Sequence, residues 1–350
     1  MLSKPKRALE LQAFIEELNQ DILGIQSSAR AYLEHGKRYA QKLDEYVNLM
    51  LGANVNRLRT LLMTQPVSTV ASWNNERWQT WDASTAKEES FIRIGDLIET
   101  RTSGGFSMPA YVPFIGQGKT VIIRSGGNTV GHGTALLQSL VVRTALMLPH
   151  QASYTLLDPA GSGIAFPMRR YLPLVQENTG DVRRDLDQVI VNIQRIIETY
   201  LDASTTSFER VPQEIRVNER FHFVFVADFP NQYDRRAIEA LQSIGNTGPA
   251  AGTYLFIHYN HNYELPRDMS MGSFKNAFYV DVESDRTFTD LNLRIRADPA
   301  PSADLQARLF QKLKDAKPPE RILNWDDLVG LQESEWWQEQ STKIDRKSVV

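Results

Sequence analysis

The stretch from Ser125 to Thr134 holds the residue types that could do chemistry in this sequence. It reads SGGNTVGHGT, follows a β-rich run at Val121–Ile123 and precedes an apolar helix pattern from Ala135. A strand, a glycine-rich loop and a helix in this order are typical of a loop that binds phosphate through backbone N–H groups at a helix N-terminus. The candidate phosphate-contacting residues are Gly127, Asn128, Thr129, Val130, Gly131, His132, Gly133 and Thr134.

The lysine that such a loop uses to hold the terminal phosphates is missing. If Thr134 supplies the hydroxyl for magnesium, Gly133 stands at the lysine position and His132 at the glycine before it. Shifting the frame by one residue puts His132 at the lysine position and Gly133 at the hydroxyl position. This alignment fits the motif less well, because glycine has no hydroxyl group. An imidazole has an ordinary pKa near ~6.5, so His132 would be a poor replacement for a fixed positive charge. The loop could bind anions weakly through the helix dipole, or it could be a tight turn that binds nothing.

A glycine-lysine-threonine run also occurs, GQGKT from Gly116 to Thr120, but it does not fit the phosphate-loop motif. Pro113 stands where the first glycine of the motif belongs, and a strand rather than a helix follows. We expect Lys119 to lie in a hairpin turn.

Two carboxylates end apolar, strand-like runs further along the chain. SYTLLD ends at Asp158, and FHFVFVAD ends at Asp228. A carboxylate at the carboxyl end of a central parallel strand is where nucleotide-bound magnesium would be held. Thr134 and Asp228 are therefore the candidate magnesium ligands. Two histidines, His258 and His261, follow near another strand end, and we expect them to be polar surface residues.

In their order, these elements resemble the FtsK/SpoIIIE-type DNA translocases. That family has a loop like GxTGSGKS, a strand ending in Asp-Pro-Lys-Gly, a strand ending in Asp-Glu, and an Arg-Ala-Ala-Gly turn before the next strand. The corresponding segments here are GNTVGHGTALLQSL, LLDPAGSG, FVFVADFP and TGPAAGTYLF, between Gly126 and Asn260. The resemblance implies a RecA-like P-loop NTPase domain, with ATP and Mg as cofactors and duplex DNA as a partner.

The departures from the family pattern fall where its chemistry happens. The lysine of the loop is replaced by Gly133, that of the second element by Ala160, the glutamate that would polarise water by Phe229, and the arginine of the last turn by Pro249. Losing a general base removes about 10²–10⁴-fold of rate. We therefore assign no catalytic residue, and expect weak or vestigial ATP and Mg binding without hydrolysis by this chain alone.

The expected role is a regulatory, scaffold or DNA-channel module of a ring-shaped ATPase, assembled as a homo-oligomer or with an intact FtsK-type ATPase domain. An active translocase that completes its site in trans and a helical adaptor that binds no nucleotide are the alternatives.

The elements that must position these residues form an α/β pattern. Short β-rich runs at SFIRIGDLIE, TVIIRS, SYTLLD, FHFVFVAD, TYLFIHY and NAFYVDV alternate with helical segments at 134–148, 181–201 and 234–244. This alternation predicts a mainly parallel sheet with helices on both faces.

A heptad seam precedes this region. Its members are Leu11, Ile15, Leu18, Ile22, Ile25, Ala29, Tyr32, Gly36, Tyr39, Leu43, Tyr46 and Met50. The seam could pack on a neighbouring helix of the same chain or on another molecule, and Gly36 could bend the helix. We expect a helical coiled-coil segment with its linker at 1–90, the degenerate P-loop domain at 91–290, and a C-terminal helix and linker at 291–350.

Composition excludes several function classes. With 350 residues and a formal charge of −3, the chain can form a sizeable core and has no strongly basic bulk balance that would mark it as a nucleic-acid binder. Its zero cysteines exclude disulfides, thiolate metal sites and cysteine nucleophiles. Neither a signal peptide nor a membrane segment is apparent, so we expect a cytoplasmic protein.

Overall fold

The computed structural model describes residues 4–99, 107–161, 165–176, 178–216, 218–282 and 293–316. The chain divides into two compact units, Met1–Met63 and Thr64–Val350. The predicted linker region 64–90 thus falls in the second unit. The part of the predicted C-terminal helix and linker that follows residue 316 lies outside the described residues.

The first unit is a single helix, α1 (Lys4–Met63). It contains the entire heptad seam, and Gly36 does not interrupt it. At 1.5 Å per residue its 60 residues span about 90 Å. Within this unit no second described helix packs on the seam.

A five-stranded parallel sheet forms the centre of the second unit, with the order β4-β5-β6-β3-β7. Its strands are β3 (Thr120–Ser125), β4 (Ala152–Leu157), β5 (Phe221–Phe229), β6 (Thr253–Asn260) and β7 (Ala277–Asp281). This confirms the predicted α/β class with a mainly parallel sheet. One strand, β6, separates the strand before the glycine loop from the strand that ends near Asp228.

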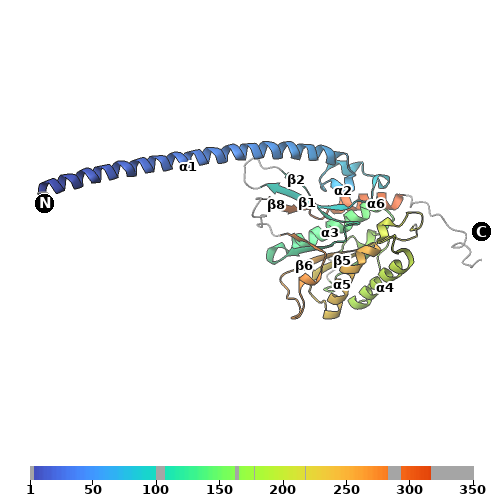
Figure 1. The fold of residues 1–350 in the computed structure, drawn as a ribbon. Helices are drawn as coiled ribbons and strands as arrows, with labels where there is room; N and C mark the ends of the chain where they lie inside the picture. The colour runs from blue at the N-terminus through green and yellow to red at the C-terminus, as the bar shows by residue number, and fades with distance from the viewer. Residues whose placement is uncertain are drawn as a thin grey trace, which may run out of the picture. The chain divides into compact units, whose positions relative to one another are not determined.

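Helices cover both faces of the large sheet, as Figure 1 shows. Helix α3 (Val130–Met147) packs on one face, while α4 (Val182–Tyr200) and α5 (Arg235–Thr247) pack together on the other. The Asp181 side chain caps α4 by accepting a hydrogen bond from the N–H of Arg183, and Asp234 caps α5 through the N–H of Ala237.

A second, antiparallel sheet of three strands lies on the far side of α3, in the order β2-β1-β8. Its strands are β1 (Phe91–Glu99), β2 (Ser107–Pro113) and β8 (Leu293–Ala297). The hairpin predicted around Lys119 is therefore wrong, because β2 and β3 belong to different sheets and do not pair. The segment 114–119 instead connects the two sheets.

Two further helices are α2 (Val67–Val70) and α6 (Ala303–Asp315). The short 3-10 helices are η1 (Glu76–Gln79), η2 (Ala83–Thr85), η3 (Gly127–Thr129), η4 (Arg169–Tyr171), η5 (Phe208–Arg210), η6 (Gly248–Ala251) and η7 (Met271–Ser273). No helix among the described residues is long and apolar enough to cross a membrane.

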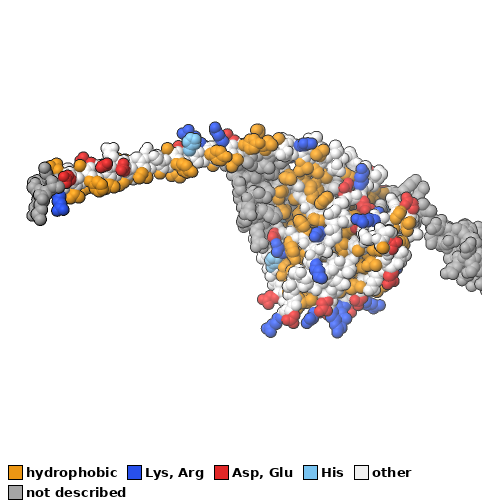
Figure 2. Space-filling view, in the orientation of Figure 1, with side chains coloured by type: hydrophobic (Ala, Val, Ile, Leu, Met, Phe, Trp, Pro, Cys, Tyr) orange, Lys and Arg blue, Asp and Glu red, His pale blue; other side chains and the backbone are white. Residues whose placement is uncertain are grey.

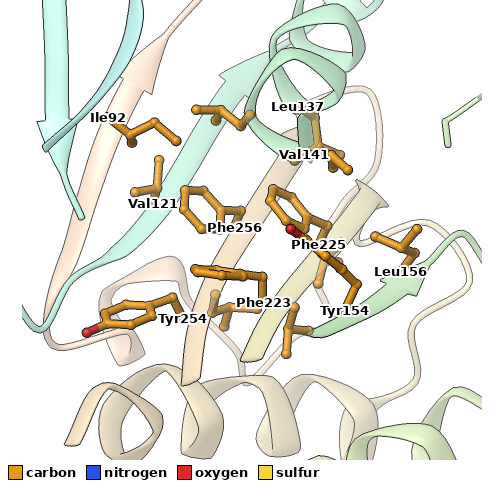
Figure 3. Packing of buried hydrophobic residues seen from close by; sticks show 14 of the residues in the cluster. Ile92, Val121, Leu137, Val141, Tyr154, Leu156, Phe223, Phe225, Tyr254 and Phe256 are labelled. Atoms are coloured by element: carbon orange, nitrogen blue, oxygen red, sulfur yellow. The ribbon is translucent and has the colours of Figure 1, made fainter. Parts of the chain in front are cut away.

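The hydrophobic core is continuous from the small sheet through α3 to the large sheet. Figure 3 shows Leu137 and Val141 of α3 above aromatic rings of β5 and β6, among them Phe225 and Phe256, which stack with centroids 4.8 Å apart. Three tryptophans of the 64–90 region, Trp73, Trp78 and Trp81, are buried in the same core.

Candidate functional site

The predicted phosphate loop lies between the carboxyl end of β3 and α3, but only half of it is a loop. Gly127–Thr129 form the 3-10 turn η3, and α3 already begins at Val130. Val130, Gly131, His132, Gly133 and Thr134 are thus the first five residues of the helix. The sequence pattern placed the helix start about four residues too late, because two glycines, Gly131 and Gly133, weaken the helical signal there.

Side chains of the protein occupy the hydrogen-bonding groups of this turn. The N–H of Gly126 donates to Thr129 Oγ1 at 3.1 Å, and the N–H of Gly127 donates to Asn262 Oδ1 at 2.9 Å. The Thr134 hydroxyl donates to the carbonyl oxygen of Val130 at 3.2 Å, one helical turn back. A phosphate or a magnesium ion would have to displace these partners to use the same groups.

A buried histidine occupies the space beside Gly133, the residue at the lysine position. His258 on β6 is 1% exposed, and its Nε2 lies 2.7 Å from Ser125 Oγ. A Cβ atom on Gly133 would lie 2.7 Å from Ser125 Oγ and closer still to His258 Nε2, so no side chain fits without movement. Burial lowers the pKa of His258 to about 4, although the negative charge of Asp228 acts in the opposite direction. The imidazole is therefore neutral at pH 7 and supplies no positive charge to the loop.

Asp228, the second predicted magnesium ligand, uses both carboxylate oxygens within the protein. Its Oδ1 accepts a hydrogen bond from the Asn260 amide at 2.6 Å, and its Oδ2 accepts one from Asn231 at 2.7 Å. Asn260 ends the neighbouring strand β6, so the parallel register brings the two side chains together. Asp228 also has a positive φ of 52°, an uncommon conformation for a residue other than glycine.

A buried tyrosine lies near both strand-end carboxylates. The single proton of the Tyr233 hydroxyl is shared between the carbonyl oxygens of Leu157 at 3.3 Å and Ala227 at 3.4 Å. Burial, together with the negative charges of Asp158 and Asp228, raises the pKa of Tyr233 well above its ordinary value. Asp158 and Asp228 thus both act on one buried phenol at this edge of the sheet.

A cleft of about 510 Å³ opens beside this edge, at the ends of β4 and β5 and the first turns of α4 and α5. Four carboxylates line it, together with Arg183: Asp158, Asp181, Asp185 and Asp234. Because the carboxylates outnumber the arginine, the lining disfavours phosphate groups. No cluster of three or more potential metal ligands occurs among the residues that the structure describes.

Sequence reasoning missed the residues that decide the chemistry of this site. It placed His258 on the surface, which is wrong because the side chain is buried next to Ser125. The available signal was the run TYLFIHYN, which is too apolar to alternate between core and solvent and therefore belongs to a strand covered on both faces. Asn260 and Asn231 carry no comparable signal. His261, in contrast, is exposed.

These residues do not fit a magnesium–triphosphate group as they are placed. The segment 126–134 contains no Lys or Arg, the position of the lysine is filled by an imidazole, and the two candidate metal ligands are hydrogen-bonded to the protein. We therefore derive no hydrolytic step at this site.

No protein-family model and no curated protein matches the sequence. Among solved structures, the chain is similar to the cytoplasmic domain of the Thermomonospora curvata type VII secretion ATPase EccC, with a TM-score of 0.51 and 13% identity over 75% of this chain and 35% of that one. It also matches EssC (ATPases 2 and 3) from Geobacillus thermodenitrificans, with a TM-score of 0.46 and 11% identity over 72% of this chain and 54% of that one. This chain thus spans about half of the EssC chain and about a third of the EccC chain.

The likeness to EccC concerns the fold, since the two sequences share only 13% of their residues. The second unit of this chain therefore has an α/β, RecA-like P-loop fold.

Proposed function

We propose that this chain is an FtsK-like module that does not hydrolyse ATP and that serves as a scaffold or regulatory part of a ring-shaped ATPase. The order of the four sequence elements supports the FtsK-like assignment, and the P-loop fold is consistent with it. Copies of this chain or an intact ATPase domain are the proposed partners in the ring.

The observation that carries this proposal is the packing of Gly133 against His258 and Ser125. A working loop needs a cation at that position to hold the terminal phosphates. Here a neutral, buried imidazole fills the place, and the glycine is required for the helix to approach β6 and β3. Restoring a lysine at position 133 alone would not restore the site, because His258 and Ser125 pack where its Cβ atom would lie.

The test measures ATP turnover and ATP binding by the full chain in the presence of Mg, alone and with Asp228→Ala. We expect no turnover above background in either protein and at most weak binding of labelled ATP. Turnover that disappears in Asp228→Ala would overturn the proposal and favour an active translocase that completes its site in trans. Because Asp228 also bonds Asn260 and Asn231, the circular dichroism of the variant has to match that of the parent.

A DNA-channel role is distinguished from a protein adaptor by duplex DNA binding at several salt concentrations. A channel module should lose DNA affinity steeply with salt, because several phosphates release counterions when they are neutralised. An adaptor should show no measurable retention at low salt. The first outcome supports a role on DNA within the assembly, and the second removes DNA from the proposal.

A further inference from the structure

The apolar seam of α1 is fully formed and has no partner within its unit. Its ten large members, Leu11, Ile15, Leu18, Ile22, Ile25, Tyr32, Tyr39, Leu43, Tyr46 and Met50, are between 44% and 82% exposed. Figure 2 shows hydrophobic side chains running along one side of the helix. Helices in proteins gain most of their stability by packing an apolar face against a partner. We therefore expect this seam to pack on a partner of matching length.

We propose that the partner is α1 of a second copy of this chain, paired in antiparallel orientation about a two-fold axis at Glu34. The seam has an unusual distribution of side-chain size that distinguishes the two orientations. Its middle holds the small residues Ala29 and Gly36 at one set of heptad positions, and the large residues Tyr32 and Tyr39 at the other set.

A parallel pair would stack each residue on its own copy. Gly36 would then face Gly36 and leave a void, while Tyr39 would face Tyr39 and crowd the adjacent layer. Voids and overpacking each weaken a packed core. Parallel pairing therefore fits the middle of the seam poorly.

The antiparallel pair instead places one heptad set opposite the other. With Glu34 on the axis, the layers become Tyr32 with Gly36, Ala29 with Tyr39, Ile25 with Leu43, Ile22 with Tyr46, Leu18 with Met50, and Ile15 with Ala53. The smallest residues face tyrosine or isoleucine, and the other layers join aliphatic side chains with one another or, at Ile22, with a tyrosine. The central layers thus combine side chains of complementary volume, which knobs-into-holes packing requires, while Leu11 at the end of the seam faces Arg57.

Charge favours the same orientation. The half of α1 at 9–33 contains four acidic residues and one basic residue, whereas the half at 35–59 contains five basic and two acidic residues. Antiparallel pairing sets the net-acidic half of one copy beside the net-basic half of the other, although Arg30 then lies opposite Arg38. Parallel pairing would set each net-charged half beside its own copy.

Distances between nitroxide labels test this arrangement in the full chain. The chain contains no cysteine, so Gln20→Cys, Ser27→Cys, Glu34→Cys and Gln41→Cys each give a single labelling site on an exposed position off the seam. We expect the shortest interchain distance at position 34. At positions 27 and 41 the labels should be equally far apart, with about 21 Å between them along the helix axis, rising to about 42 Å at position 20.

Two results would overturn the proposal. Equal distances at all four positions would mean a parallel pair, and the absence of any interchain distance would mean that the seam binds something other than a second copy. Sedimentation velocity of the unlabelled chain checks that the dimer forms without the labels.

Substitution of one glycine provides an independent test, because the expected change in dimer affinity has opposite signs for the two orientations. Gly36→Leu should weaken the antiparallel dimer by about tenfold or more, because the new side chain meets Tyr32 of the second copy. In a parallel pair the same change would fill a void and strengthen the dimer. Gly24→Leu is the matched control, because Gly24 is also a helical glycine with open space around it but lies off the seam, so it reports helix propensity alone.

Discussion

At the scale of single residues, the feature that defines the candidate site is Gly133, which has no side chain at the position where a phosphate loop has its lysine. Two glycines only two positions apart in α3 have opposite surroundings. Gly133 faces His258 and Ser125 at distances that leave no room for a Cβ atom, whereas Gly131 has no heavy atom within 4 Å of that position. The first glycine is required by packing with β6 and β3, and the second is not.

This contrast predicts opposite effects of two alanine substitutions. Gly133→Ala should lower the free energy of unfolding by about 1–3 kcal/mol, because the methyl group overlaps a buried imidazole. Gly131→Ala should raise it by about 0.5–1 kcal/mol, because alanine is the better helix former. Urea unfolding followed by tryptophan fluorescence measures both. Gly133→Ala should cost less in a His258→Ala background than in the parent, because the overlapping imidazole is then absent, and a change of equal size and sign in the two single glycine variants would contradict this account of Gly133.

At the scale of elements, a buried ionic cluster fixes α3 to the small sheet. Asp298, which follows β8, pairs with Arg143 of α3 at 2.7 Å and with Arg93 of β1 at 3.0 Å. The two guanidinium groups are 0% and 2% exposed. Arg143 also donates to the carbonyl oxygens of Ser68 and Ala71, so the cluster joins four segments of the chain.

Removing the shared carboxylate should therefore cost more than removing an exposed one. Asp298→Ala removes the carboxylate paired with the fully buried Arg143 and leaves Arg93 with Asp96 alone, so it should lower the free energy of unfolding by about 3–5 kcal/mol. Asp281→Ala is the control, because its pair with Arg124 is about a quarter to a third exposed and should contribute about 1 kcal/mol or less. Chemical denaturation gives both values. Similar losses in the two variants would mean that the buried cluster contributes no more than a surface pair.

The elements also show what a sequence can reveal about this fold. Regular alternation of apolar runs identified every strand of the large sheet and the helices α4 and α5, whose starts at Asp181 and Asp234 carry clear capping residues. The run SFIRIGDLIE was predicted as a strand and forms β1, but its separate antiparallel sheet was missed, because β1 pairs with β8 some two hundred positions later and no local pattern encodes such a contact. The role of His258 was missed for the same reason, since its partner Ser125 lies on another strand.

At the scale of the whole molecule, the boundary between the helix and the α/β unit has a measurable consequence. The sequence suggested a linker up to residue 90, whereas the compact units divide after Met63. The region in between is tied to the core of the second unit. Trp73 donates its indole N–H to Ser139 of α3 at 2.8 Å, and Lys312 of α6 donates to the carbonyl oxygens of Gln79 and Trp81.

Two truncations separate these boundaries. A chain that starts at Thr64 should unfold cooperatively with the thermal midpoint of the parent α/β unit, because it keeps all three core tryptophans. A chain that starts at Phe91 loses Trp73, Trp78 and Trp81, which are 6%, 3% and 1% exposed. Each large aromatic removed from a core costs about 3–5 kcal/mol, so the combined loss reaches the entire stability of an ordinary domain, about 5–15 kcal/mol. Near-ultraviolet circular dichroism during heating measures the outcome. If the shorter fragment melted at the same temperature as the longer one, the segment from 64 to 90 would be a linker, and the tryptophan contacts would not contribute to the stability of the α/β unit.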